Sequence, residues 1–589
     1  MIAHLRRALA LVLLSASPAF AGTYDLIIDR TVVSIDGKQR SVVSINGQIA
    51  GPTLRWKEGE EVTVNVANRL KEETSIHWHG IYLPFYMDGV PMVSFAGIKP
   101  SQSFTYRFKV RQSGTYWYHS HSGGQEQEGM YAPIVIEPAK GERYKVDRDY
   151  VVMLSDSHSM SASAILRKLK QEPGYFNNRK RTFPDLVRDL GNSKSSDERQ
   201  AIIRDRLDWG NMRMDPTDLA DVTGYTFLVN GRGPSDNWTG LFRPGEKVRL
   251  RFINGSAMTI FDTRIPGLKL KVVQADGQDV VPVDVDEFRI GVGETYDVIV
   301  EPKDGRAYTV HAASIDRRGA ARGTLAPREG MVGPIPEMPP PSLLTMADMG
   351  HGAMAGMDHS KMPPATVGGP PVVDHSKMGH SKMDAPKVAP ATMDHSKMDP
   401  TMDPSKMNPM AMGPPDTSGL VHVPPVDAPR GTRVLSYLDL KRLDRSYSLN
   451  PPSRTIEIRL TGNMEKFIWS FDDKKYSEEP VMSFTEGETV RLLLKNETMM
   501  NHPIHLHGIL MDLDNGAGNE RPRKHVVIVP PGRTVSVTVH MTEIGRWPFH
   551  CHLMFHMMTG MFREFVVNPS GGALPPAGQS MGGGSVHKH

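Results

Sequence analysis

The chain has 589 residues, of which 35 are methionine, 23 are histidine and one is cysteine. Its formal net charge is +3, far from the concentrated basic charge of a nucleic-acid-binding protein, so we expect no nucleic-acid partner. A single cysteine excludes an intramolecular disulfide framework and a four-cysteine zinc site.

Residues 1–21 are predicted to be an export signal. Arg6-Arg7 precede the apolar run Ala8–Leu14, and Ala19-Phe20-Ala21 matches an A-x-A cleavage site. The apolar run is too short for a transmembrane helix, and no later stretch reaches 18 apolar residues, so we expect no stable membrane insertion. The arginine pair is compatible with both the twin-arginine (Tat) and the general (Sec) route. The mature protein is therefore expected outside the cytoplasm.

Three parts of the chain have the pattern of short β-strands: 22–140, 141–329 and 430–569. Polar and apolar residues alternate in Thr63–Val66, Phe104–Phe108, Lys247–Phe252 and Val535–Val539. Glycine and proline separate these runs, and many short strands at such spacing are typical of a β-sandwich or barrel. We therefore predict an all-β fold with three domains.

Two internal segments and the C-terminus depart from this pattern. Residues from about 158 to 215 are charged and have helical spacing, as at Ile165, Leu166 and Leu169. They predict a helical insertion in the second domain, either a plain surface feature or a gate for substrate. Residues 330–429 form a linker of low complexity. Residues 570–589 are predicted to be a flexible tail, and its terminal His587-Lys588-His589 fits a solvated end.

The linker repeats the unit Met-Asp-His-Ser-Lys-Met with variations. Such a polar, proline-rich segment cannot bury enough apolar surface to offset its ordering entropy, so we expect disorder. Thioethers are soft ligands that select Cu(I), and imidazole also suits copper. A segment that only connects two domains has no need to repeat methionine and histidine together. We predict accessory copper ligands at Met357, His359, Met362, His375, Met378, His380, Met383, Met393, His395 and Met398.

Four short histidine motifs carry the main chemistry. They are His77-Trp78-His79-Gly80, His119-Ser120-His121, His502–Gly508 and His550-Cys551-His552. Residues i and i+2 of a strand point to the same face, so each H-x-H pair delivers two imidazoles to one side. Eight imidazoles from two facing domains would enclose several metal ions, and imidazole suits Cu, Zn, Fe and Ni.

The lone cysteine narrows the choice of metal. The side chain of Cys551 points away from those of its neighbours, toward a face where it can meet His502 and His556. Two histidines, a thiolate and a weak axial methionine, here Met561, form a blue-copper electron-transfer site. Electrons can leave this site through the Cys551 backbone and reach the histidine cluster.

These motifs resemble those of the multicopper oxidases: H-W-H-G, H-S-H, H-P-x-H-L-H-G and H-C-H-x₃-H-x₄-M all match. The export signal, the helical insertion and the Met/His repeats are similar, more narrowly, to the periplasmic copper-resistance proteins A of bacteria. The resemblance implies three cupredoxin-like Greek-key domains and four catalytic coppers. It also implies that one-electron oxidations at a type 1 copper are coupled to four-electron reduction of O₂ to water at a trinuclear cluster.

The resemblance assigns a role to each motif residue. Type 1 copper would be bound by His502, Cys551, His556 and Met561, and type 2 copper by His77 and His505. One type 3 copper would be bound by His79, His119 and His552, and the other by His121, His507 and His550. Cys551 would be the point of electron entry and transfer.

The acidic residues that would supply protons match the family's pattern less completely than the copper ligands do. Asp88 matches the position of the family's proton-donating aspartate, which makes it the candidate proton donor, and the alternative interpretation is a turn residue before Gly89. Several family members have a glutamate after the second type 1 histidine, where this chain has Met557. Glu126 and Glu128 are alternative acids. Met557 and Met558 fit either a Cu(I) landing place or packing.

The expected function is a periplasmic copper-resistance oxidase that converts Cu(I) to Cu(II), with copper ions and O₂ as its partners. Other periplasmic copper-resistance proteins are further candidate partners, and we expect a monomer. Two alternatives stay open: a copper-sequestering binding protein, and a laccase-like oxidase of phenols.

Overall fold

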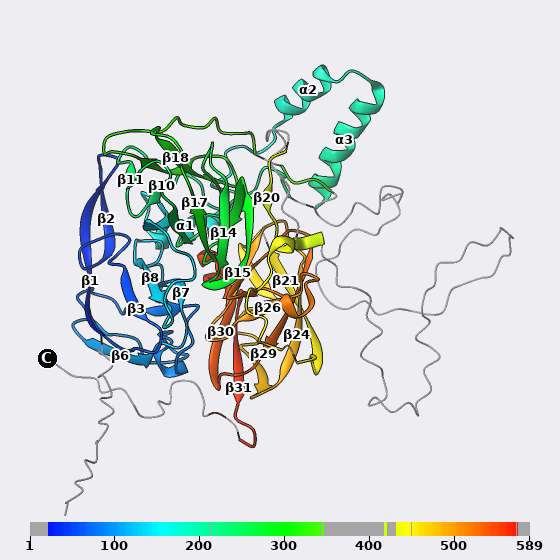
Figure 1. The fold of residues 1–589 in the computed structure, drawn as a ribbon. Helices are drawn as coiled ribbons and strands as arrows, with labels where there is room; N and C mark the ends of the chain where they lie inside the picture. Colours follow the sequence, from blue (N-terminus) through cyan, green and yellow to red (C-terminus); the bar gives the residue numbers. More distant parts are fainter. Residues whose placement is uncertain are drawn as a thin grey trace, which may run out of the picture.

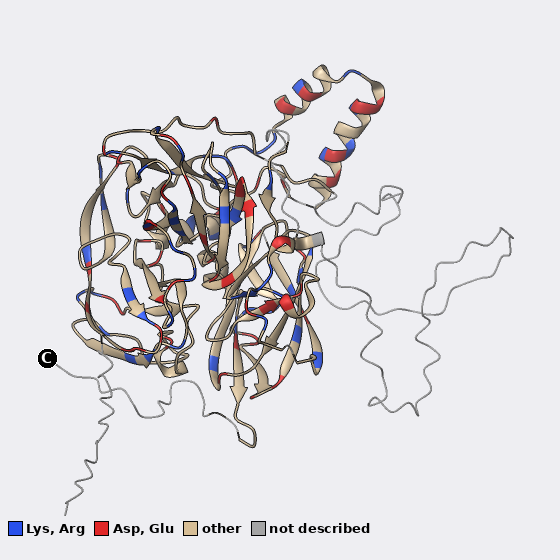
Figure 2. Ribbon diagram, viewed as in Figure 1, with Lys and Arg blue, Asp and Glu red and all other residues tan. Residues whose placement is uncertain are grey.

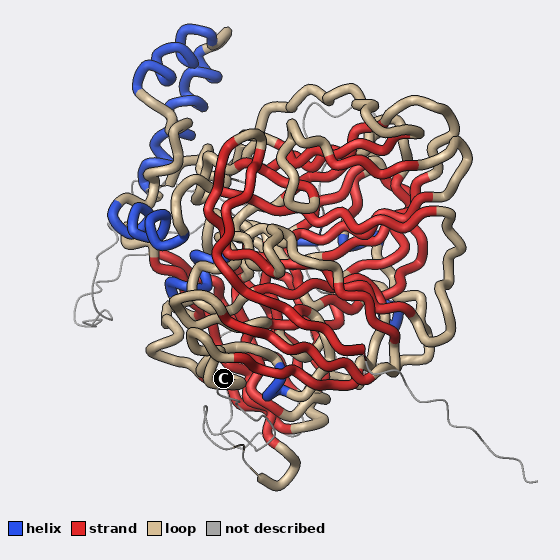
Figure 3. Tube along the Cα trace, turned by 90° about the vertical axis from the view of Figure 1, so that its left-hand side faces the viewer, coloured by secondary structure: helices blue, strands red, loops and turns tan. Residues whose placement is uncertain are grey.

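The computed structural model describes residues 22–574 except 213, 342, 347–417, 421–430, 449, 464 and 573. The predicted export signal, all the accessory Met/His ligands and residues 575–589 of the tail lie outside the described residues. Strands dominate the described part of the chain, as predicted (Figure 3). No helix within it is long and apolar enough to cross a membrane.

The first β-unit has two four-stranded sheets, coloured blue to cyan in Figure 1. In spatial order, one contains β2 (Lys38–Ile45), β1 (Gly22–Ile35), β4 (Glu61–Asn68) and β6 (Ser103–Lys109). The other contains β3 (Leu54–Lys57), β8 (Tyr131–Glu137), β7 (Gly114–His119) and β5 (His77–His79). Along β4 the buried residues Val62, Val64 and Val66 alternate with less buried residues, which places one face of its sheet on the core.

The second β-unit has two six-stranded sheets. The first contains β10 (Thr226–Val229), β9 (Arg148–Ser157), β12 (Val248–Asn254), β17 (Thr295–Val300), β14 (Leu270–Ala275) and β15 (Gln278–Val285). The second contains β11 (Trp238–Leu241), β19 (Ala320–Ala326), β18 (Tyr308–Ser314), β13 (Phe261–Arg264), β16 (Glu287–Ile290) and β20 (Val434–Leu435). Strand β12 is buried along its whole length because it is covered on both faces.

The third β-unit holds half of the histidine motifs. Its six-stranded sheet contains β22 (Ile468–Phe471), β21 (Arg454–Asn463), β24 (Thr489–Asn496), β29 (Thr534–His540), β26 (Met511–Leu513) and β27 (Arg523–Lys524). Its five-stranded sheet contains β23 (Val481–Thr485), β31 (Phe562–Asn568), β30 (Gly545–Cys551), β25 (His502–Leu506) and β28 (Val526–Val529).

The predicted helical insertion is present. Helix α1 (Ala162–Gln171) begins after Ser161, whose side chain caps it, and buries Ile165 and Leu169 in the core of the second unit. Helices α2 (Phe183–Asn192) and α3 (Ser196–Asn211) form a hairpin that projects from the body of the molecule (Figure 1). Both signs of charge lie along this hairpin (Figure 2). A short fourth helix, α4 (Met554–Thr559), follows the cysteine motif.

The segments at both ends of the predicted linker contact the second unit. Val434–Leu435 were expected in the third domain, but this strand, β20, pairs in parallel with β16 and so extends a sheet of the second unit. At the other end of the linker, Leu344 and Met346 pack against the apolar core that the second and third units share, and the Leu344 amide donates to the carbonyl oxygen of Pro216. The sheets of the third unit begin only at Arg454.

A buried ionic cluster joins the second and third units. The Lys524 ammonium lies 3.0 Å from Asp276 and 3.0 Å from Glu294, and all three side chains have no exposed surface. Tyr437 donates a hydrogen bond to Glu294 at 2.6 Å. The two carboxylates raise the pKa of Lys524 against the opposing effect of its burial, so the amine stays charged.

We predict that Lys524→Met destabilises the protein by about 3–5 kcal/mol, because removing one partner leaves buried charge uncompensated. Thermal and denaturant unfolding would measure the loss. Lys495→Met is the matched control, since Lys495 makes an exposed pair with Glu497 that contributes about 0–1 kcal/mol. Equal stability of the two variants would contradict the assigned role of Lys524.

Candidate metal centres

The eight predicted cluster histidines converge where the first and third units meet. Paired strands set the register: His77 of β5 lies opposite His119 of β7, and His505 of β25 lies opposite His550 of β30. The two units also interleave their rings. His77 stacks on His507 with ring centroids 3.8 Å apart, and His79 stacks on His505 at the same distance.

Three groups made only of the eight predicted cluster histidines come close enough to hold metal ions, and a fourth group joins His79 and His505 to His525. Within each group the nearest nitrogens lie within 4.8 Å of one another. The three groups are His79, His119 and His552; His121, His507 and His550; and His77, His505 and His507. The first two are the sets expected to hold the type 3 coppers, and the third contains both expected type 2 ligands.

The hydrogen bonds of these rings distinguish an outer from an inner nitrogen. The outer Nδ1 atoms of His77, His119, His505 and His550 contact backbone carbonyl oxygens at 2.7–3.0 Å. The inner nitrogens are buried and have no partner, namely Nε2 of His77, His119, His121, His505 and His552. Unpaired buried nitrogens are costly, and a set of them aimed at one space is the pattern of a metal site.

The inner nitrogens of His507 and His550 also indicate a metal site. Nε2 of His507 and Nε2 of His550 lie 3.0 Å apart, so two lone pairs face each other unless one carries a proton. Burial and neighbouring imidazoles lower the pKa of most of these rings well below the ordinary value, and that of His550 to about 3. The rings are therefore neutral near pH 7, which is the form that binds metal. The donor set fits copper.

Asp88 lies against the cluster rather than serving only as a turn residue. Its side chain is fully buried, with Oδ2 2.8 Å from Nδ1 of His507 and Oδ1 3.3 Å from Nδ1 of His77. The backbone turns sharply after it at Gly89, whose φ is +82°. A Cβ at Gly89 would lie 1.7 Å from the carbonyl oxygen of Ile76, so only glycine fits there.

The structure separates the two alternative acids. Glu126 is buried, with Oε2 3.0 Å from Nδ1 of His119 and Oε1 3.9 Å from Nδ1 of His552. Burial raises the pKa of Glu126 well above its ordinary value. Glu128 instead forms an ion pair with Arg30 at 2.9 Å, away from the cluster.

The second centre contains the cysteine. Sγ of Cys551 lies 3.5 Å from Nδ1 of His502 and 3.7 Å from Nδ1 of His556, and the two Nδ1 atoms lie 3.2 Å apart. Met561 is fully buried, and its carbonyl oxygen accepts a hydrogen bond from the Cys551 amide. Burial raises the pKa of the thiol well above its ordinary value, so a bound cation is required to hold it as thiolate.

The outer side of this centre is also fixed. Nε2 of His502 contacts Oγ1 of Thr498 at 2.7 Å, and Nε2 of His556 contacts Oδ2 of Asp221 at 2.8 Å. Trp469 stacks on the His556 ring with centroids 3.9 Å apart. Both imidazoles therefore present Nδ1 toward Cys551.

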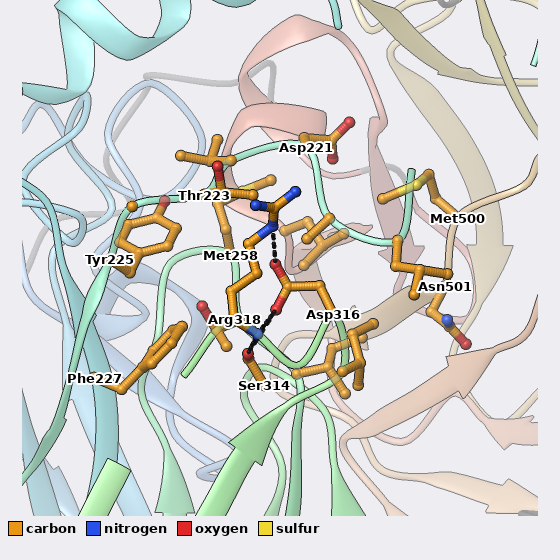
Figure 4. A pocket seen from close by; sticks show the side chains of 18 of the residues that line it. Asp221, Thr223, Tyr225, Phe227, Met258, Ser314, Asp316, Arg318, Met500 and Asn501 are labelled. Carbon is orange, nitrogen blue, oxygen red and sulfur yellow. Dashed lines mark hydrogen bonds and ion pairs between the residues drawn. The ribbon is translucent and has the colours of Figure 1, made fainter. Parts of the chain in front are cut away.

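A cavity of about 290 Å³ (Figure 4) reaches this centre through Asp221, which lines the cavity and contacts His556. Asp221, Met258 and Met500 line it, together with Tyr225 and Phe227. Burial raises the pKa of Asp221 to about 7. The Arg318 guanidinium in the same wall is paired with Asp316 at 3.5 Å.

Several of these residues could hardly be predicted from the sequence. Asp221 lies 335 positions before His556, and only the spacing of Asp215, Asp218 and Asp221 marks an acidic loop. Met500 lies just before the H-P-x-H motif. Like Met557 and Met558, it is distinguished in the sequence only as a methionine close to a histidine of the cysteine centre. Those two line a different cavity, which opens at His121 rather than at the cysteine centre.

The comparisons with known proteins identify the class. Models of the multicopper oxidase family match residues 28–141, 148–328 and 450–571. The chain therefore belongs to the multicopper oxidases, which are oxidoreductases that bind type 1, type 2 and type 3 copper, and the predicted fold, family and cofactor are confirmed.

Individual relatives narrow the class to copper resistance. The chain is 50% identical to Copper resistance protein A of Escherichia coli, over 94% of this chain and 93% of that protein. It is also 50% identical to the Copper resistance protein A homolog of Pseudomonas syringae pv. tomato, over 92% and 91%. The crystal structure of Fet3p, a multicopper oxidase that functions in iron import, shares the fold, with a TM-score of 0.63 and 16% identity over 93% and 90% of the two chains. The chain is a copper-resistance multicopper oxidase.

We predict that the copper-free protein loses stability as the pH falls below about 6.5. An unfolded histidine gains a proton near that pH, whereas His550 in the fold does not until about pH 3, so each such residue disfavours folding by up to about 1.4 kcal/mol per pH unit between these values.

Thermal unfolding at pH 7.5 and 5.5 checks this sign. His550→Gln removes one of the shifted groups, so its unfolding temperature should depend less steeply on pH than that of the unsubstituted chain. An unfolding temperature that rises on acidification would contradict the burial of neutral imidazoles.

Proposed function

We propose that this copper-resistance oxidase acts in the periplasm by oxidising Cu(I) to Cu(II) and reducing O₂ to water. The observation that carries the proposal is the cavity beside His556, where two thioethers and a buried carboxylate meet a ligand of the cysteine centre. Soft thioethers favour Cu(I), and a carboxylate favours the more charged product. The predicted export signal supports the periplasmic location, by either the Tat or the Sec route.

The ligand assignment is part of the proposal. Type 1 copper would be held by His502, Cys551, His556 and Met561, type 2 copper by His77 and His505, and the type 3 pair by the two further histidine groups described above. Bound copper would supply one-electron transfer at the cysteine centre and reduction of dioxygen at the cluster. The Met/His repeats as accessory ligands and the monomeric state remain predictions.

Individual side chains then have distinct tasks. The Asp221 carboxylate accepts a hydrogen bond from His556 and holds its ring in place at the edge of the cavity. Cys551 is covalently adjacent to His550 and His552, so an electron entering at its sulfur reaches the cluster ligands through one residue of backbone. Asp88 and Glu126 contact cluster imidazoles and are placed to hold or deliver protons that the reduction of O₂ consumes.

A small phenol is the second candidate substrate, since Tyr225 and Phe227 line the same cavity. The cavity volume of about 290 Å³ is at the lower end for organic ligands, which favours an ion. Pure copper sequestration is less well supported, because a store has no need for a cysteine held between two cluster histidines.

Replacing Asp88 by asparagine tests the proton supply. We expect Asp88→Asn to reduce O₂ about a hundredfold more slowly, because the amide cannot donate as an acid, while copper content and the blue absorption stay unchanged. Oxygen-electrode turnover and absorption spectroscopy provide the two measurements. The exposed Asp284→Asn serves as control, and unsubstituted turnover in Asp88→Asn would overturn the role.

Substitutions in the cavity test the substrate. We expect Asp221→Asn to lower kcat/KM for Cu(I) about tenfold, a loss of about 1.4 kcal/mol, with the blue absorption retained. The double variant Met258→Leu/Met500→Leu should raise KM for Cu(I) while leaving oxidation of a small phenol unchanged, since leucine keeps the cavity apolar but lacks sulfur. Equal effects on both substrates would favour the laccase-like alternative.

A further inference from the structure

A second cavity has methionines in its wall and is lined in part by residues of α4. It has a volume of about 420 Å³ and is bounded by residues 90–93 of the first unit and by α4 and Phe562 of the third. Three thioethers line it, from Met92, Met557 and Met558, and it reaches His121. It shares no lining residue with the cavity beside His556.

Packing does not explain the methionine at position 92, because its side chain is exposed. Its side chain is 77% exposed, and its φ is +68°, in the left-handed region that disfavours residues other than glycine. The Met92 amide donates to the carbonyl oxygen of Phe95 at 2.9 Å, which fixes the turn. Strained backbone retained at an exposed position is a feature of functional sites. On the opposite wall, Met558 is 37% exposed.

The inner end of the cavity is a cluster imidazole. His121 is half-buried, whereas the other seven cluster histidines are fully buried. Its Nε2 is nevertheless enclosed and has no hydrogen-bond partner. The cavity wall therefore combines the exposed methionines Met92 and Met558 with the imidazole that has an unpaired nitrogen at the edge of the cluster.

The polar surroundings differ on the two sides of His121. A third cavity also reaches this ring, but Arg30, Glu72, Glu73 and Glu128 line it, and their charged side chains suit water and protons. On the methionine side the one cationic residue in the cavity wall, Lys475, lies 3.7 Å from the Glu478 carboxylate, which offsets its charge. A soft cation is thus accommodated on the methionine side.

We propose that Met92, Met557 and Met558 form a Cu(I)-binding entry site through which copper is loaded into the cluster. It is separate from the cavity where Cu(I) would act as electron donor. The proposal rests on the cluster assignment made above. No electron is transferred in the step: Cu(I) exchanges thioether ligands for imidazole nitrogens, beginning with Nε2 of His121.

The test is the rate of copper loading, which does not depend on turnover. Copper-free full-length protein is mixed anaerobically with Cu(I) or, separately, with Cu(II). Protein-bound copper is then measured after desalting, and cluster occupancy by electron paramagnetic resonance after oxidation. We expect Met92→Leu/Met558→Leu to load the cluster from Cu(I) about tenfold more slowly, with loading from Cu(II) unchanged.

Controls separate sulfur ligation from folding and from access. Leucine keeps the cavity wall apolar and removes only the sulfur. The control variant Met160→Leu/Met482→Leu removes two partly buried thioethers from elsewhere in the fold. Unaltered Cu(I) loading in Met92→Leu/Met558→Leu would overturn the proposal, and so would an equal slowing with both ions, which would indicate a steric passage only. Because copper content is the readout, failure of Cu(I) oxidation would be distinguishable from failure of the entry site.

Discussion

The structure depends on bringing eight imidazoles, seven of them buried, face to face between the first and third β-units. The outer nitrogens of five rings contact backbone carbonyls or Asp88, and most of the inner nitrogens have no hydrogen-bond partner. Without a metal this arrangement is costly, because each inner nitrogen loses its hydrogen bond to water. Copper therefore stabilises the fold as well as the site, and the union of two distant parts of the chain is linked to the cofactor.

Strand alternation then couples this cluster to the cysteine centre. On β30 and just beyond it, His550 and His552 face the cluster while Cys551 faces the core of the third unit, where His502 and His556 lie within 4 Å of its sulfur. One residue of backbone thus separates the proposed point of electron entry from the proposed site of dioxygen chemistry. The distance is set by peptide geometry and cannot relax, which suits a reaction in which electrons arrive singly.

Much of this could be predicted from sequence because the ligands come in short motifs whose geometry is local. Each H-x-H pair follows from the two-residue period of a strand, and the position of Cys551 follows from the same period. The periodicity of polar and apolar residues predicted the all-β fold and the helical insertion. The resemblance of the motifs to those of the family implied the cupredoxin-like domains. These features require no knowledge of which segments meet in space.

The remaining features depend on contacts between distant segments. Asp221 reaches His556 from a loop after the insertion, and Met258 enters the same cavity from the loop before β13. No local pattern joins them. Glu126 and Glu128 were indistinguishable in sequence, yet only Glu126 is directed at the cluster, while Arg30 holds Glu128 outside. Met557 and Met558 were adjacent to a cysteine-centre ligand in sequence, but the turn of α4 directs them into the cavity at His121.

The most direct test of the central claim is the electron balance of the copper-loaded protein. O₂ consumption, Cu(I) oxidation and hydrogen peroxide would be measured together, with Cys551→Ser as the matched variant. Coupled four-electron chemistry requires four Cu(I) ions oxidised per O₂, no peroxide, and no uptake above background in Cys551→Ser. Peroxide as the main product, or equal uptake by both proteins, would contradict the coupling of the cysteine centre to the histidine cluster.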